Sequence, residues 1–278
     1  MLRYFRGKCI VQPLSFTALA FLFVAGECSG QPAVGPSLTS VTPAVAAITV
    51  PPSALSPVDY RYMTALGTRL NVPGHERIVL NGTLTYPGVS APQIVSAVLT
   101  LQLPHSLRID VPGGSKPLIY DGTTLNPGSF TQTDANALLQ MLIEDTEEAY
   151  LIQRATGAAF RTISHASNVI DNLDAAREVS HCRTIQGVFP ILYGAPQEVA
   201  KTYCFDTVSY WLEYTFSVIQ SGTTTVHRAT SFRNWSQISG ESYPWRIVLR
   251  DNGAVKYAYM ATVMSVSPAA ADGTFSGN

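Results

Sequence analysis

The chain has 278 residues, of which 46% are hydrophobic and 13% are charged, and its formal net charge is −1. It carries no basic excess that would attract nucleic acid or an anionic surface, so neither is an expected partner. Its length allows a sizeable hydrophobic core.

The first thirty residues differ in kind from the rest of the chain. Arg3, Arg6 and Lys8 form a basic head, and an apolar run over 14–25 ends in small residues. This order is typical of a secretory signal, and the run is shorter than the roughly 20 residues that cross a bilayer. We therefore expect residues 1–30 to be a signal sequence and the protein to be exported, to the periplasm or outer envelope.

Cys28 leaves two outcomes open for this segment. A cysteine directly after the apolar run is where bacterial lipoprotein signals are cut and acylated, which would tether the protein to a membrane. Such sites take a small residue before the cysteine, whereas this chain has Glu27. Ordinary cleavage near Gly26 or Gly30 is therefore the alternative. Loss of residues 1–30 removes three basic residues and one acidic residue, which changes the net charge from −1 to −3.

Residues 31–57 contain six prolines and no charged residue. Because proline disfavours both helix interiors and central strands, this segment is predicted to be an extended tether. The remaining residues, 58–278, are enough for one folded domain.

A change of hydrophobic period marks the first elements of this domain. Tyr62, Leu66 and Leu70 recur every four residues, which indicates an amphipathic helix. Along residues 77–86 and 99–103 apolar and polar side chains alternate instead. These two segments are therefore predicted to be half-buried strands.

Two shorter strands and a helical segment follow. Residues 107–111 and 117–122 are strand candidates separated by a Pro-Gly-Gly turn signal, and 133–157 return to the helical period. The acidic run EDTEE, at 144–148, is expected to be a solvated helix face and turn. An ion site at this run is the alternative.

The last hundred residues are predicted to be nearly all strand. In SYWLEYTFSVIQSG the even positions are apolar, which places Tyr210, Leu212, Tyr214 and Phe216 on one inward face. The sequence at 251–253, Asp-Asn-Gly, predicts a tight hairpin turn. Since strand follows strand without a helix between, the sheet is expected to be an antiparallel meander.

Cys204, Asp206 and Ser209 lie close together in the sequence and raise the question of catalysis. A nucleophile needs a positioned base and an oxyanion site, usually at a strand-to-helix turn or a helix N-terminus, and the surroundings of Cys204 have neither. His181 and Cys182 are adjacent, so in a strand their side chains point to opposite faces. We expect no enzyme, with a contact between His181 and Cys204 across strands as the catalytic alternative.

Cys182 and Cys204 remain after loss of the signal. In an oxidising compartment an even pair is interpreted first as a disulfide. If 176–187 and 199–206 are neighbouring antiparallel strands, the two cysteines lie opposite each other. The five histidines lack metal-ligand spacing, and there is no phosphate-binding or hydrolase motif, so neither a metal nor a cofactor is expected.

Several motifs together resemble a known superfamily. The segments are KTYCFDTVSYWLEYTFSV, FRNWSQISGESYPWRIVLRDNGAVKYAYMATV and ADGTFSGN. The form W-x-x-x-x-G-x-x-x-P-x-x-I matches Trp235, Gly240, Pro244 and Ile247, and an Asp-x-x-Phe ending matches Asp272 and Phe275. With the order helix, strands, helical insertion and long meander, the chain resembles the periplasmic lipoprotein carriers of the LolA and LolB type, which sort outer-membrane lipoproteins.

This resemblance implies a mainly β (α+β) fold: a strongly curved antiparallel sheet, or incomplete β-barrel, with helices over its open side. It also implies an apolar cavity for a lipid or an acylated protein. The side chains expected to line that cavity are Ile78, Leu80, Leu99, Leu101, Tyr210, Leu212, Tyr214, Phe216, Trp245 and Ile247. The same apolar face also fits a filled core, and the alternative function is then a surface-exposed β-rich interaction module on a proline-rich stalk.

Overall fold

The computed structural model describes residues 49–87, 91–113, 116–157, 160–163, 181–189, 197–221, 223–270 and 273–276. All of them fall in one unit, Thr42–Asn278. The expected signal sequence, Cys28 and residues 31–48 of the expected tether lie outside the described residues. None of the helices in the described ranges is long and apolar enough to cross a membrane.

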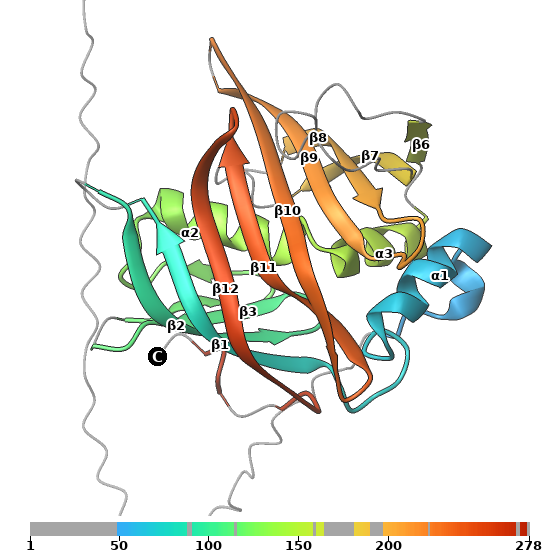
Figure 1. The fold of residues 1–278 in the computed structure, drawn as a ribbon, viewed down its shortest axis with the longest axis horizontal. Coiled ribbons are helices and arrows are strands. Elements are labelled where there is room, and N and C mark those ends of the chain that lie inside the picture. The colour runs from blue at the N-terminus through green and yellow to red at the C-terminus, as the bar shows by residue number, and fades with distance from the viewer. Residues whose placement is uncertain are drawn as a thin grey trace, which may run out of the picture. The chain divides into compact units, whose positions relative to one another are not determined.

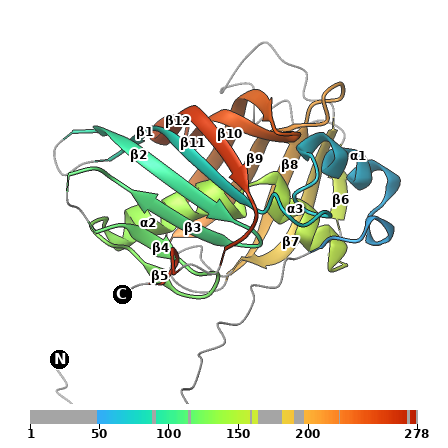
Figure 2. The ribbon, with the colours of Figure 1, turned by 90° about the horizontal axis from the view of Figure 1, so that it is seen from below.

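One antiparallel sheet of twelve strands curves around the helices (Figures 1 and 2). The strands are β1 (Arg77–Tyr86), β2 (Gln93–Gln102), β3 (Ser106–Asp110), β4 (Leu118–Tyr120), β5 (Leu125–Asn126), β6 (Phe160–Ile163), β7 (His181–Phe189), β8 (Gln197–Phe205), β9 (Leu212–Ser221), β10 (Thr224–Ile238), β11 (Glu241–Asp251) and β12 (Ala254–Ser267). Their spatial order is β5-β4-β3-β2-β1-β12-β11-β10-β9-β8-β7-β6. The sheet is therefore open, with β5 and β6 at its edges, and the expected incomplete barrel is confirmed.

Pairing between β1 and β12 brings the two ends of the domain together in the middle of the sheet. Leu80 lies opposite Leu99 of β2 and opposite Met264 of β12. The predicted hairpin between β11 and β12 is confirmed: Asn252 has φ 49° and Gly253 has φ 82°. These left-handed conformations match the twist of tight two-residue hairpins.

The first helix, α1 (Pro57–Leu66), follows a short 3-10 turn, η1 (Pro52–Ala54). Ser56 caps it by accepting a hydrogen bond from the Asp59 amide at 3.2 Å. The helix ends at Gly67, which has φ 116° and no room for a side chain beside Gly240 and Glu241. The helix is thus shorter than predicted. Leu70 belongs to the loop that follows it, and its side chain is buried in the core.

The predicted helical segment 133–157 has three parts that lie against the concave face of the sheet (Figure 1). They are α2 (Gln132–Leu139), the π-helix η2 (Gln140–Glu144) and α3 (Glu147–Ala155). Thr146 restarts the helix, because its hydroxyl accepts a hydrogen bond from the Ala149 amide at 3.3 Å.

Apolar side chains fill the space between this helical segment and the sheet, which we call the interlayer. Its fully buried members include Leu80, Leu84, Leu99, Leu107, Ile109, Leu138, Leu139, Ile247, Leu249 and Tyr259. Burial at about 25 cal/mol for each Å2 of apolar surface makes such a layer the main source of stability.

The prediction that Tyr210, Leu212, Tyr214 and Phe216 share one inward face is wrong, because β9 contains a β-bulge. Leu212 pairs with Phe205 and Tyr214 with Cys204, so Glu213 is the extra residue. Because one extra residue reverses the side-chain alternation, Leu212 faces the interlayer, whereas Tyr214 and Phe216 face the outer side of the sheet. Tyr214 there forms a separate buried cluster with the two cysteines.

The prediction that the acidic run at 144–148 is solvated is also wrong. Glu144, Asp145 and Glu147 are buried, not solvated. The Nζ of Lys201 lies 2.8 Å from Asp145 and 3.4 Å from Glu144, while Glu147 accepts a hydrogen bond from the Leu212 amide at 2.9 Å. These groups are buried because β8 and β9 supply their partners, which the local pattern does not show.

Candidate functional site

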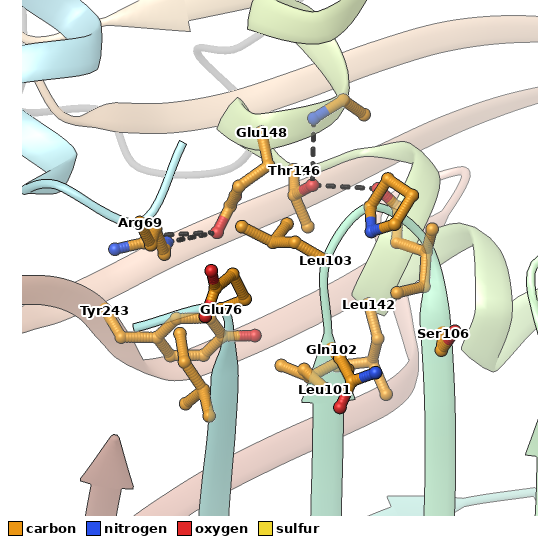
Figure 3. Close-up of a pocket in the computed structure, with 14 residues that line it drawn as sticks. Arg69, Glu76, Leu101, Gln102, Leu103, Ser106, Leu142, Thr146, Glu148 and Tyr243 are labelled. Atoms are coloured by element: carbon orange, nitrogen blue, oxygen red, sulfur yellow. Dashed lines mark hydrogen bonds and ion pairs between the residues drawn. The ribbon is translucent and has the colours of Figure 1, made fainter. Parts of the chain in front are cut away.

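The interlayer reaches the surface at one end, in a small pocket that we call the mouth (Figure 3). Fourteen residues line it: Arg69, Glu76, Ile78, Leu101, Gln102, Leu103, Pro104, Ser106, Leu142, Ile143, Thr146, Glu148, Ala149 and Tyr243. They come from the loop after α1, the start of β1, the β2–β3 turn, η2, α3 and β11. Its volume is about 30 Å3, which is room for about one water molecule.

A buried arginine organises the polar side of the mouth. Arg69 donates to Glu148 Oε1 from Nε at 3.0 Å and from a terminal nitrogen at 2.8 Å. Its other terminal nitrogen lies 3.2 Å from Glu241 and 2.7 Å from the Leu66 carbonyl. Arg69 is only 1% exposed. Burial opposes its charge, but the two carboxylates outweigh burial and raise its pKa above the ordinary value.

Two carboxylates at the mouth, Glu241 and Glu76, are held ionised by hydrogen bonds. Burial opposes ionisation of Glu241, yet donors from Thr68, His75 and Arg69 lower its pKa. Burial also opposes ionisation of Glu76, whose pKa is lowered by the amides of Gly74 and Ala269. These amides lie 3.0 and 3.1 Å from the Glu76 carboxylate. Glu241 and Glu76 therefore keep their negative charges at neutral pH.

Tyr243 is the exception among the polar groups of the mouth. It is 2% exposed, and its hydroxyl has no hydrogen-bond partner within the described part of the chain. Figure 3 shows this hydroxyl pointing into the pocket. Burial raises the pKa of Tyr243 well above the ordinary value, so the hydroxyl keeps its proton. A buried donor without a partner costs about 1–3 kcal/mol unless a water or a ligand satisfies it.

The opposite side of the mouth is apolar. Leu101 comes from β2 and Leu103 from the turn after it, and Leu142 and Ile143 come from η2. A π-helix is rare and occurs frequently at functional sites. An apolar wall that faces a hydrogen-bonding end suits an amphiphile, with its chain along the wall and its polar group at Tyr243.

The structure divides the residues expected to line a cavity into four groups. Ile78 and Leu101 line the mouth, and Tyr210 and Trp245 are half-buried beside the core. Four residues are packed inside the interlayer: Leu80, Leu99, Leu212 and Ile247. Tyr214 and Phe216 lie on the other face of the sheet, as the bulge at Glu213 requires.

The predicted pairing of the two cysteines is confirmed. Cys182 and Cys204 occupy opposite positions in β7 and β8, and their sulfur atoms are bonded at 2.06 Å. Cys204 is therefore not a free thiol. His181 lies opposite Phe205 in the register, on the face away from the bridge.

Two further hollows, of about 330 and 310 Å3, lie elsewhere on the domain. One is beside the C-terminal residues 273–276, and the other is at Trp245, Arg246 and Met260. No residue of α2, η2 or α3 lines either hollow. No group of three or more metal-ligating side chains occurs in the ranges that the structure describes.

Sequence reasoning missed Arg69, Glu148 and Tyr243 as site residues. Tyr243 had a signal, since it shares the alternation of Ile247 along β11. Arg69 had none, because a loop residue has no periodicity. Its burial follows from the end of α1 at Gly67, which turns the next residues toward Glu241.

The domain belongs to the class of open antiparallel sheets that curve around a helical segment. No family model and no curated protein matches the chain. The structure is similar to an outer membrane lipoprotein-sorting protein domain from Vibrio parahaemolyticus, with a TM-score of 0.45 and 8% identity over 72% of this chain and 89% of that one.

Two other solved structures give similar values. A LolA superfamily protein from Nitrosomonas europaea has a TM-score of 0.44 and 12% identity over 77% of this chain and 97% of that one. A DUF1329 family protein from Desulfovibrio piger has a TM-score of 0.44 and 7% identity over 80% of this chain and 98% of that one.

Proposed function

We propose that this protein is a non-enzymatic protein of the cell envelope that binds the acyl chain of a lipid or of an acylated protein in the interlayer, through the mouth. The observation that carries the proposal is the mouth itself. There an apolar layer reaches the surface beside a buried Tyr243 hydroxyl that has no partner in the described residues. The proposed role is carriage of such a molecule within the envelope.

Binding requires the mouth to widen, because its present volume of about 30 Å3 holds no acyl chain. The apolar walls that must move apart are formed by Leu142 and Ile143 of η2 on one side and by Leu101 of β2 and Leu103 of the β2–β3 turn on the other. Contacts between such walls are apolar and non-directional, and each methylene of a bound chain regains about 0.8 kcal/mol by burial. An acyl chain can therefore offset the separation of these walls.

Other features support an envelope location. The expected signal sequence indicates export, and the Cys182–Cys204 bridge suits an oxidising compartment. In this proposal residues 31–48, and Cys28 where it is acylated, hold the domain at a membrane where lipids are exchanged. The mass of the mature N-terminus distinguishes an acylated Cys28 from a free secreted protein.

The test is uptake of the uncharged fluorescent probe N-phenylnaphthylamine by the purified protein, together with mass spectrometry of extracted lipids. Leu103 lies half-buried at the mouth, so Leu103→Arg should weaken probe binding by about tenfold, or 1.4 kcal/mol. Ile94→Arg, on the outer face, is the matched control. Absence of both extracted lipid and probe uptake would refute the proposal.

The second candidate function, an interaction module, has one observation in its favour. Ile94, Met260 and Val263 are 72%, 51% and 54% exposed on the outer face of β2 and β12. Exposed apolar residues that share a face are typical of protein contacts. Loss of a co-purified protein in the Met260→Lys variant, with lipid binding absent from the wild type, would favour this function.

A further inference from the structure

We propose that the mouth selects acyl chains joined through an ester or amide to a polar end without negative charge, and that it discriminates against free fatty acids. The inference rests on the proposed function and names the class of its ligand. It follows from two independent observations, which are the charges around the mouth and the unpartnered hydroxyl of Tyr243.

The charges around the mouth sum to a negative value. Arg69 is its only lining cation among the described residues, and that charge is shared between Glu148 and Glu241. The carboxylates that line the wall are Glu76 and Glu148, whereas Glu241 contacts Arg69 from outside the lining. One lining cation against two lining carboxylates leaves a net charge of −1, and Glu241 adds a negative charge next to Arg69, so a ligand carboxylate at this position meets repulsion in a partly buried setting.

The other cationic groups nearby do not offset this charge. Arg77 does not line the mouth: its Nε donates to the Oε1 of Gln102, a lining residue, at 2.8 Å, and a terminal nitrogen donates to the Ala270 carbonyl at 2.9 Å. His75 bonds Glu241 at 2.9 Å from the solvent side, with 39% of its side chain exposed. Burial lowers the pKa of His105, which leaves that ring uncharged at neutral pH.

Tyr243 supplies the favourable interaction that selects a ligand. Its hydroxyl keeps its proton and points into the pocket, so it can donate a hydrogen bond to an acceptor oxygen of a ligand. A carbonyl directly beside an acyl chain, as in an ester or amide, offers that acceptor without a charge. The polar end beyond it then lies near Glu148, whose side chain is 12% exposed and accepts donors such as hydroxyl groups.

The experiment compares monododecanoylglycerol with dodecanoate as competitors of N-phenylnaphthylamine at neutral pH. The two share a chain length, so the comparison isolates the polar end and needs no variant. We expect the ester to bind at least about tenfold tighter than the acid. In Tyr243→Phe we expect the ester to bind about fivefold to tenfold more weakly, while dodecanoate changes little. Tyr60→Phe, on the exposed face of α1, is the matched control.

The outcomes separate this inference from the function on which it rests. Equal or tighter binding of dodecanoate overturns the selectivity and leaves amphiphile binding in place. Unchanged ester binding in a folded Tyr243→Phe protein overturns the role of the hydroxyl. Failure of both competitors and of the probe to bind overturns the proposed function as well.

Discussion

The two halves of the concave face differ in what they present to the same helical segment. On β1 to β4 and on β11 and β12 the inward side chains are mostly apolar, as in Leu80, Leu99 and Ile247. On β7 to β10 they include Arg183, Lys201, Thr215, Arg228 and Thr230, and these contact polar groups of the helices.

Directional contacts hold the polar half together. Asp145 lies between η2 and α3. Its carboxylate lies 2.8 Å from the Nζ of Lys201 and accepts a hydrogen bond from the Thr230 hydroxyl, and its backbone carbonyl accepts one from the Thr215 hydroxyl at 2.6 Å. Asp59 of α1 accepts from Tyr150 at 2.6 Å and lies 3.0 Å from Arg183. Such a network has one satisfied geometry, and breaking it leaves buried charges without partners.

The difference indicates which half can open. Separating apolar walls exposes hydrocarbon, which a lipid can cover again, whereas separating the ionic contacts requires water or new partners. The mouth lies where the apolar half meets η2 and the start of α3. We therefore expect the polar half to anchor the helical segment while the apolar half admits ligand.

Removal of the buried lysine should have the largest effect. Lys201→Ala leaves Asp145 and Glu144 without their buried cation and should lower the free energy of unfolding by about 3–5 kcal/mol. Lys256→Ala, on the exposed side of β12, should stay within about 0.5 kcal/mol. Urea unfolding measures both. Similar values for the two variants would contradict the anchoring role.

A cavity in the apolar half should lower stability nearly as much but improve ligand uptake. Leu99→Ala should lower the free energy of unfolding by about 3 to 4 kcal/mol. Because an apolar cavity stays dry and binds apolar molecules, the variant should bind N-phenylnaphthylamine more tightly than the wild type. Titration of the probe checks this, with Ile94→Ala as the exposed control. A loss of probe binding in folded Leu99→Ala would argue against the interlayer as the binding space.

Loss of the disulfide should lower stability without affecting uptake. The bridge closes 22 residues and lies on the outer side of the polar half, so Cys182→Ala with Cys204→Ala should lower the free energy of unfolding by about 3 kcal/mol. Probe binding should remain that of the wild type. Denaturant titration with and without reductant provides the check, since reductant should destabilise the wild type alone.

Two buried glutamates, Glu147 and Glu241, should give opposite pH dependences. Burial raises the pKa of Glu147 well above the ordinary value, so the stability that its proton maintains is lost as pH rises above the unfolded value of about 4.3. Glu147→Gln should remove this loss, about 1.4 kcal/mol for each unit by which the folded pKa exceeds the unfolded one. The pKa of Glu241 is lowered, so its effect is the opposite. The stability that the ionised Glu241 provides is present above the unfolded pKa and is lost as pH falls through the folded pKa.

Urea unfolding of the wild type and Glu147→Gln at a series of pH values between 4 and 8 measures this effect. The difference between the two proteins should grow with pH. A constant difference would show that Glu147 has the same pKa in the folded and unfolded states.

The sequence was most informative where structure follows from near neighbours. Alternation identified β1, the end of β2, β3 and β4, and the Asp-Asn-Gly turn identified the hairpin of β11 and β12. The opposite placement of Cys182 and Cys204 followed from two strands and their connection. Each of these depends on side-chain period or turn conformation, which a short segment sets by itself.

The sequence was least informative about polar groups in the interior. The acidic run 144–148 was expected to be solvated, since nothing local supplies its partners. Lys201 shares the alternation of Tyr203 and Phe205, which was the one signal for an inward cation. Its partner could not be predicted, because Asp145 is 56 residues away in the chain.

By itself, then, the sequence predicted most of the strands, the helical segment and the pairing of Cys182 with Cys204. The tertiary structure alone decided that Glu213 bulges, that Tyr214 and Phe216 face outward, and that Arg69 and Tyr243 meet at the mouth. The physical reason is range. Backbone period and turn geometry are local, whereas the burial and pairing of a charge depend on which distant strand lies opposite it.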